Sequence, residues 1–292
     1  MQVVENIALL REFTSHAREP LVFVPTMGAL HQGHAALLQQ ARQVAGELGT
    51  VVASIFLNPT QFNHPTDLEL YPRSPSSDQE LCKKLHVDVL FSPRVEEIYH
   101  PEASISVHED QLSAALCGKS RPGHFQGVLT IVTKLFNMID PDVAIFGEKD
   151  WQQLILVRRL VRDLNFKVHI LSHPTVREQD GLAMSSRNQR LSAQERAVAP
   201  QIYRTLQQTR DRVLRGERNL PSLLKQVEAI FRSMPHATIE YITIVHEETL
   251  QPLLTLEKSM TPARLFVALH LGNVRLIDNI DLPIHDSKQE QH

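Results

Sequence analysis

The chain has 292 residues, of which 42% are hydrophobic and 22% charged, with a formal net charge of −3. These values are typical of a soluble globular protein with one large or two ordinary domains. The balance of charge argues against a nucleic-acid partner. No apolar run approaches the ~18 residues that cross a bilayer, and the first residues lack the pattern of a signal peptide. Two cysteines cannot build a disulfide framework, so we expect a cytoplasmic protein.

Short apolar runs alternate with helical patterns over the first 175 residues. The predicted strands lie at 21–24, 51–57, 87–91, 143–146 and 167–171, and the predicted helices at about 34–48, 77–85, 125–139 and 150–163. Strands that are apolar throughout and separated by helices are typical of a parallel sheet covered on both faces. We therefore predict a doubly wound, Rossmann-like α/β domain over 1–175, with ligands at the carboxyl ends of its strands.

The pattern changes after about residue 176. Ser192 and Glu195 have the spacing of a capping box, which predicts a long helix to about residue 215. A second helix at about 221–233 is followed by strand-like runs at 238–245, 264–269 and 274–277. Strands that follow helices without a βαβ rhythm predict a smaller α+β domain over 176–292. Its polar tail at 286–292 is expected to fray.

The most informative segment is VPTMGALHQGH at 24–34, where a predicted strand leads through Pro25 and Gly28 into a helix. The free backbone N–H groups at such a helix start favour an anion. His31 and His34 are three residues apart, so both imidazoles can donate to that anion. We interpret the anion as a phosphate. Zinc is the alternative, but zinc-binding helices usually space histidines four apart, and the two cysteines stand alone.

Further polar clusters follow the other predicted strands. Asn58 and Gln61 carry amides that suit a ligand with hydroxyl and carboxylate groups, although an Asn-Pro turn is the ordinary alternative. After the fourth predicted strand, Lys149 can neutralise a polyphosphate, and Gly147 allows a ribose to approach the backbone. Asp150 can accept from the ribose hydroxyls. The alternative there is an acidic helix start that the helix dipole favours.

Two loop motifs complete the set. Arg121, in RPGHF at 121–125, can hold a carboxylate or phosphate, or can lie in a surface loop. The segment MSSRN at 184–188 lies near the boundary between the predicted domains. Its hydroxyls and its cation suit a mobile clamp for a polyphosphate, and a capped turn is the ordinary alternative.

Together these segments resemble the pantoate–β-alanine ligases, or pantothenate synthetases, of the adenylate-forming HxGH nucleotidyltransferase superfamily. The motifs that carry the resemblance are VPTMGALHQGH (24–34), SIFLNPTQF (54–62), YPR (71–73), RPGHF (121–125), FGEKD with QQ (146–150 and 152–153) and MSSRN (184–188). The resemblance covers nearly the whole chain. It implies a HIGH-type nucleotidyltransferase fold and an enzyme of pantothenate biosynthesis, in the coenzyme A pathway. ATP and pantoate would form pantoyl adenylate and pyrophosphate, and β-alanine would then displace AMP.

The resemblance also implies roles for individual residues. The expected catalytic residues are His34, His31, Lys149 and Arg187. The expected ATP-binding residues are Met27, Gly28, Ala29, Leu30, His31, Gln32, Gly33, His34, Gly147, Glu148, Lys149, Asp150, Val176, Met184, Ser185, Ser186 and Arg187. The expected substrate-binding residues are Gln61, Gln153, Asn58, Tyr71 and Arg121.

Mg²⁺ is the expected metal, carried mainly by the ATP phosphates, with Asp78 as its protein ligand. Ser76 and Ser77 stand where some relatives carry further acidic residues, which weakens the protein's own metal site. The family also implies a homodimer formed through the large domain. Two alternatives to the ligase are a related nucleotidyltransferase that acts on a phosphorylated alcohol and a non-catalytic nucleotide-binding protein.

Overall fold

The computed structural model describes residues 1–63, 65–256 and 262–283. The tail predicted to fray lies outside the described residues. The chain divides into two compact units, Met1–Val176 and Arg177–His292, and each is described by itself. Among the described residues, no helix combines the length and the apolar character needed to cross a membrane.

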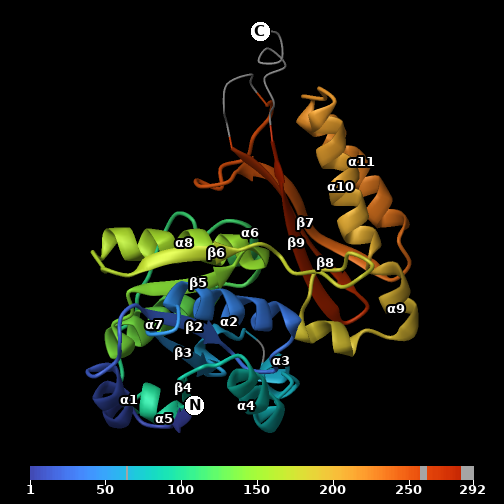
Figure 1. Ribbon diagram of the computed structural model, residues 1–292. Coiled ribbons are helices and arrows are strands. Elements are labelled where there is room, and N and C mark those ends of the chain that lie inside the picture. Colours follow the sequence, from blue (N-terminus) through green and yellow to red (C-terminus); the bar gives the residue numbers. More distant parts are fainter. Residues whose placement is uncertain (64, 257–261, 284–292) are drawn as a thin grey trace. The chain divides into compact units, whose positions relative to one another are not determined.

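The first unit is built on a six-stranded sheet with the order β1-β4-β3-β2-β5-β6 (Figure 1). Its strands are β1 (Gln2–Val4), β2 (Leu21–Thr26), β3 (Thr50–Ile55), β4 (Val89–Phe91), β5 (Val143–Gly147) and β6 (His169–His173). Every paired neighbour is parallel. This confirms the predicted doubly wound, Rossmann-like sheet. The chain proceeds from β2 toward β3 on one side and returns to β5 on the other, so the topological switch point lies between β2 and β5.

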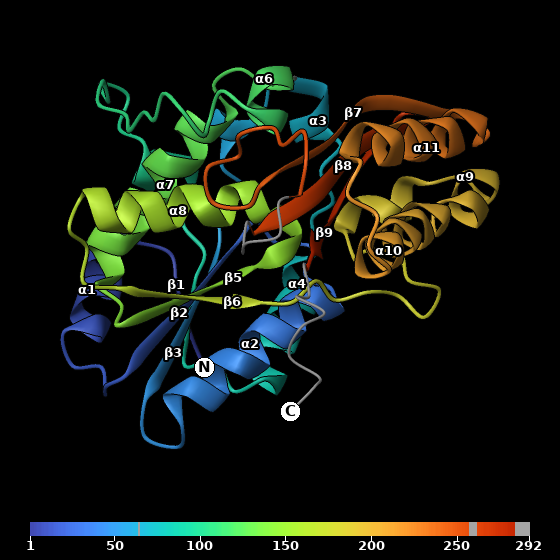
Figure 2. The same ribbon diagram turned by 90° about the horizontal axis from the view of Figure 1, so that it is seen from above.

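Helices cover both faces of this sheet, with α2 on one face and α7 and α8 on the other (Figure 2). The helical segments are α1 (Ile7–Thr14), α2 (Gln32–Ala45), η1 (Pro59–Gln61), α3 (Pro65–Glu69), α4 (Pro75–Lys84), α5 (Val95–Ile98), α6 (Leu116–Ser120), α7 (His124–Ile139), η2 (Glu148–Asp150) and α8 (Trp151–Asp163). Val22 and Val24 belong to the core cluster shared with α2. Phe23 between them packs edge-to-face on Phe136 of α7, with ring centroids 6.4 Å apart. The alternation explains why β2 is apolar and buried from Leu21 to Val24.

The second unit is a three-stranded antiparallel sheet with helices packed on it. Its strands are β7 (Ala237–His246), β8 (Ala263–Leu271) and β9 (Val274–Leu282), and its helical segments are η3 (Ser186–Arg190), α9 (Ala193–Val198), α10 (Gln201–Leu214) and α11 (Leu220–Ser233). The core between sheet and helices includes Leu206, Phe231 and Leu265, all fully buried. The predicted small α+β fold is confirmed.

Some elements differ from the sequence-based expectation. The capping box of Ser192 and Glu195 is present, but the helix that it starts ends at Val198. A new helix begins at Gln201, because Pro200 has no N–H to continue the ladder of hydrogen bonds. Strand β1 and helix α1 were not predicted. A three-residue strand and an eight-residue helix are too short to produce a clear periodic pattern.

Candidate active site

The turn after β2 depends on a glycine. Gly28 has φ +82°, and Ala29 follows at φ +50°. A Cβ on Gly28 would lie 3.0 Å from Ile55 Cγ2 and 3.2 Å from the Oδ2 atom of Asp78. The left-handed backbone and the close neighbours both favour glycine here. The turn delivers the chain to α2 with His31 as its N-cap residue.

The two histidines form a capping box, which fixes the role of each ring. The backbone N–H of Gly33 donates to His31 Nδ1 at 3.1 Å, and the backbone N–H of His31 donates to His34 Nδ1 at 3.2 Å. The ring centroids are 4.1 Å apart. Because both Nδ1 atoms accept hydrogen bonds, each neutral ring carries its proton on Nε2. In each ring the Nε2–H group is then the donor. His31 caps the helix instead of lying within it.

The pKa of His34 falls from 6.5 to about 3. Desolvation in the packed turn is the main cause, the nearby His31 and Lys149 add to it, and Asp150 acts in the opposite direction. The ring is neutral near pH 7. It can donate a hydrogen bond to a phosphate, but it holds no extra proton to transfer.

The end of β5 lies beside this turn because β2 and β5 are neighbouring strands. Lys149 and Asp150 both affect the pKa of His34, so the two predicted ATP-binding segments lie near one another at the switch point. A Cβ on Gly147 would meet no described atom within 4 Å, so space is open beside that backbone. Glu148 Oε1 accepts from the Ser172 hydroxyl at 2.8 Å, which joins the ends of β5 and β6.

Asp78 supports the turn instead of facing an open site. Its Oδ2 accepts from the Ala29 N–H at 2.9 Å, and its Oδ1 accepts from the Leu30 N–H at 2.8 Å. The Ser74 hydroxyl also donates to Oδ1, and Asp78 is only 2% exposed. Both oxygens are thus occupied, so this geometry gives no support to Asp78 as a Mg²⁺ ligand. No group of three or more His, Cys, Asp or Glu side chains in the described chain is arranged to hold a metal.

Gln61 ends η1, directly after β3, and is 9% exposed. Its Oε1 accepts from the Nδ2 of Asn58 at 3.1 Å, and its Nε2 lies against Met27 Sδ. Asn58 is 1% exposed, and the same Nδ2 also donates to the Gly127 carbonyl at 3.1 Å. The donors of Asn58 are committed inside the protein, where one of them supports Gln61.

The backbone of Gln61 is held from α7. Its carbonyl oxygen accepts from Arg121 Nη2 at 3.1 Å and lies 2.7 Å from His124 Nδ1. A Cβ on Gly127 would lie 2.5 Å from the Thr60 carbonyl oxygen, so only glycine lets the helix approach this closely. Arg121 therefore reaches the backbone of Gln61, a predicted substrate-binding residue. Neither His124 nor Gly127 was predicted, because nothing in their spacing marks a residue that supports another loop.

The structure distinguishes the two adjacent glutamines at the start of α8. Gln152 is 4% exposed, and its Nε2 donates to the carbonyls of Leu112 and Ala115, both at 2.8 Å. Gln153, the predicted substrate residue, is half-buried. Tyr71 is 6% exposed and packs edge-to-face on Phe62, with centroids 5.8 Å apart.

The remaining predicted ATP residues lie at or beyond the end of the first unit. Val176 is its last residue, and Met184 and the start of η3 belong to the second unit. Ser185 caps η3 by accepting from the Arg187 N–H at 3.2 Å, and Ser186 is buried. Arg187 is half-buried.

An ionic network holds the base of this segment. Glu178 accepts from Asn188 Nδ2 at 2.7 Å and from Arg196 Nη2 at 2.6 Å. Arg196 also donates to Asp180 at 2.7 Å, which lowers the pKa of that carboxyl. Arg177 pairs with Asp278 through both guanidinium nitrogens, at 2.6 and 2.9 Å. The structure contains both the turn capped by Ser185 and the ionic network around Glu178. The sequence predicted the capped turn only.

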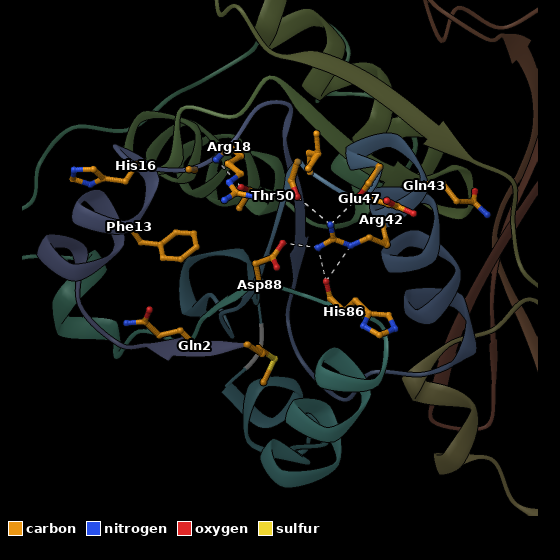
Figure 3. Close-up of a pocket in the computed structure, with 15 residues that line it drawn as sticks. Gln2, Phe13, His16, Arg18, Arg42, Gln43, Glu47, Thr50, His86 and Asp88 are labelled. Atoms are coloured by element: carbon orange, nitrogen blue, oxygen red, sulfur yellow. Dashed lines mark hydrogen bonds and ion pairs between the residues drawn. The ribbon is translucent and has the colours of Figure 1, made fainter.

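A separate cavity of about 1120 Å³ lies at the opposite edge of the first unit's sheet (Figure 3). Thr50, at the amino end of β3, lines it together with Arg18 of the loop between α1 and β2. Arg42 points toward Asp88 and donates to the His86 carbonyl. The loops that carry the predicted site residues leave the carboxyl ends of the strands, so this cavity is not the candidate active site.

A family model for pantoate–β-alanine ligases matches residues 2–281. The chain belongs to the pantoate–β-alanine ligase family. The family resemblance expected from the motifs is therefore confirmed.

Individual pantoate–β-alanine ligases match almost end to end. The pantothenate synthetase of Akkermansia muciniphila is 50% identical over 275 residues, which covers 94% of this chain and 96% of that protein. The one from Thermotoga petrophila is 46% identical over 282 residues, covering 96% and 99%. The crystal structure of pantothenate synthetase from Thermus thermophilus has a TM-score of 0.90 at 44% identity, covering 97% and 99%.

A second solved ligase shows what one member of the family binds. It is the pantoate–β-alanine ligase from Francisella tularensis, complexed with β,γ-ATP and β-alanine. Its TM-score to this chain is 0.77 at 35% identity, with coverage of 96% and 97%.

Proposed function

We propose that this chain is an ATP-dependent ligase that condenses pantoate with β-alanine to give pantothenate, AMP and pyrophosphate. The observation that carries the proposal is the placement of His34 and Lys149 together at the switch point, in a chain of the pantoate–β-alanine ligase family. Ligands of doubly wound folds bind at that point. The Francisella ligase, with a nucleotide and β-alanine bound, supports the same pair of substrates.

The first step is attack of the pantoate carboxylate on the α-phosphorus of ATP, with pyrophosphate leaving. Negative charge grows on the phosphate oxygens in that transition state. The Nε2–H groups of His31 and His34 donate to those oxygens, and the Lys149 ammonium adds a positive charge. The neutral state of His34 suits a hydrogen-bond donor that keeps its proton. In the second step the β-alanine amine attacks the acyl carbon of pantoyl adenylate and AMP leaves, so the protein needs no Ser or Cys nucleophile.

Gln61 and Gln153 hold pantoate, and Gln61 also borders the β-alanine site. Gly147 and Asp150 face the ribose, and backbone groups near Val176 read the adenine edge. Tyr71 shapes the wall beside Gln61. Positioning is a large part of this catalysis, because two anions that repel one another must be brought into line.

The second unit also carries residues that we propose bind ATP. Arg187 carries the cation, and the hydroxyls of Ser185 and Ser186 accompany it. The network around Glu178 supports this role, because Glu178 holds Asn188, the residue next to Arg187, and also pairs with Arg196. The described side chains do not form a metal site, so we propose that Mg²⁺ enters on the ATP phosphates and not on Asp78. We also propose a cytoplasmic homodimer, in line with the family.

Product analysis separates this proposal from its alternatives. With ATP, pantoate and β-alanine, the ligase yields AMP and pantothenate in equal amounts. A nucleotidyltransferase acting on a phosphorylated alcohol would instead leave a dinucleotide-like product. A non-catalytic protein would bind ATP and release no AMP.

A further inference from the structure

The orientation of the Gln61 side-chain amide follows from atoms whose roles are fixed by their chemistry. Asn58 lies between a backbone acceptor and a backbone donor. The Gly127 carbonyl, which can only accept, lies 3.1 Å from Asn58 Nδ2. The Thr60 N–H, which can only donate, lies 3.3 Å from Asn58 Oδ1. A flipped amide would set donor against donor and acceptor against acceptor, so Asn58 has one orientation.

Two hydroxyls reinforce that orientation. Thr60 Oγ1 and the hydroxyl of Tyr99 each donate to Asn58 Oδ1 at 2.9 Å. Burial raises the pKa of Tyr99, so its hydroxyl stays protonated and able to donate. The Tyr99 ring is held in turn by Phe56, with ring centroids 6.2 Å apart. The hydroxyl that donates to Asn58 is therefore carried by a ring that packs against Phe56.

The fixed amide of Asn58 then determines that of Gln61. Asn58 Nδ2 has two protons, of which one goes to the Gly127 carbonyl and the other to Gln61 Oε1 at 3.1 Å. Gln61 Oε1 must therefore face Asn58, since the reverse orientation would bring two NH₂ groups together. Gln61 Nε2 is then turned away from Asn58, and it also lies against Met27 Sδ.

We propose that Tyr99 is a positioning residue that, with Thr60, acts through Asn58 to fix the Gln61 amide so that its Nε2–H group meets the substrate. The pantoate oxygen that meets Gln61 is then an acceptor, and an analogue with a protonated amine at that atom is rejected because two donors would face each other. This inference rests on the proposed function. It assigns a role to a tyrosine that lies outside all of the site motifs.

The test is the pantoate-dependent exchange of labelled pyrophosphate into ATP, measured for Tyr99→Phe, Thr60→Val and the double variant. We expect the KM for pantoate to rise about threefold for each single variant and about tenfold for the double variant. The KM for ATP should stay within about twofold. A general loss of folded protein would lower kcat and would not raise the KM for pantoate alone. Tyr203→Phe is the matched control, because its hydroxyl makes no hydrogen bond in the described part of the chain.

Asn58→Asp provides a second, stronger variant. The new oxygen would face both the Gly127 carbonyl and Gln61 Oε1, so Gln61 must rotate and present its carbonyl to the substrate. We expect pantoate-dependent exchange to fall at least about a hundredfold while ATP binding, measured by calorimetry, persists. An unchanged KM for pantoate in the double variant would overturn the proposal. A normal KM for pantoate in Asn58→Asp would also overturn it. A wild-type protein without exchange would instead overturn the proposed function.

Discussion

The backbone N–H of His31 donates to the Nδ1 of His34 at 3.2 Å. This bond makes the second histidine part of the cap of α2 and directs its remaining N–H away from the helix. The geometry thus uses one ring for two purposes: it satisfies a backbone donor that a helix start leaves open, and it fixes the tautomer of a candidate catalytic group.

Replacing the ring of His34 removes a donor to the developing charge. We expect His34→Ala to lower the rate of adenylate formation by roughly 10²–10³-fold, which is the usual effect of losing one such donor. Single-turnover measurement of pantoyl adenylate checks this. His108→Ala, an exposed histidine paired with Asp110, is the control and should leave the rate unchanged. A near-normal rate in His34→Ala would remove the residue from this role.

The lowered pKa of His34 predicts a loss of stability in acid. The folded pKa is about 3 and the ordinary value is 6.5, so below pH 6.5 the unfolded chain binds a proton that the folded chain does not. The free energy of unfolding therefore falls as the pH drops from 6.5 toward 3, by at most about 1.4 kcal/mol per pH unit for this group.

Urea unfolding at pH 6.5 and at pH 4.5 measures this effect. His34→Gln should lose less stability between the two pH values than the wild type does, because glutamine does not titrate. Equal losses in the two proteins would show that His34 is not the group responsible.

Gly127→Ala tests the close contact between α7 and η1. The added methyl group would lie 2.5 Å from the Thr60 carbonyl oxygen and 2.8 Å from the Gln61 nitrogen, both backbone atoms. Relieving such overpacking typically costs about 1–3 kcal/mol and moves the backbone, so we expect a lower melting temperature and a higher KM for pantoate. Asn137→Ala, exposed on the same helix, is the control. A wild-type KM for pantoate in Gly127→Ala would mean that Gln61 does not depend on this contact.

Arg42→Ala should lower the stability of the protein and leave its activity unchanged. The guanidinium donates to the carbonyl groups of His86 and Gly49 and pairs with Asp88, all at the sheet edge away from the candidate active site. Removing it takes away hydrogen bonds to exposed and partly buried acceptors, and we expect a loss of about 0.5–1.5 kcal/mol in unfolding free energy. The KM values for ATP and pantoate should not change. Arg162→Ala, from an exposed ion pair, should cost less than about 0.5 kcal/mol.

The sequence predicted the fold class because the periodic pattern of its long elements is strong. The apolar run of β2 and the turn through Gly28 locate the loop that we propose binds phosphate, and the adjacent parallel strand β5 leads to Lys149 near it. The roles of supporting residues could not be predicted. Asn58 and Asp78 carry the chemistry of ligands, and only their partners in three dimensions show that their polar atoms are already used. Tyr99 has no sequence signal, because a hydroxyl that orients another amide follows no spacing rule.

The central claim is that pantoate is activated as an adenylate between the turn after β2 and the turn after β5. The most direct measurement is exchange of labelled pyrophosphate into ATP in the presence of pantoate and the absence of β-alanine. The account predicts rapid exchange that requires pantoate and that falls sharply in His34→Ala. Folded wild-type protein that binds ATP but shows no pantoate-dependent exchange would contradict it.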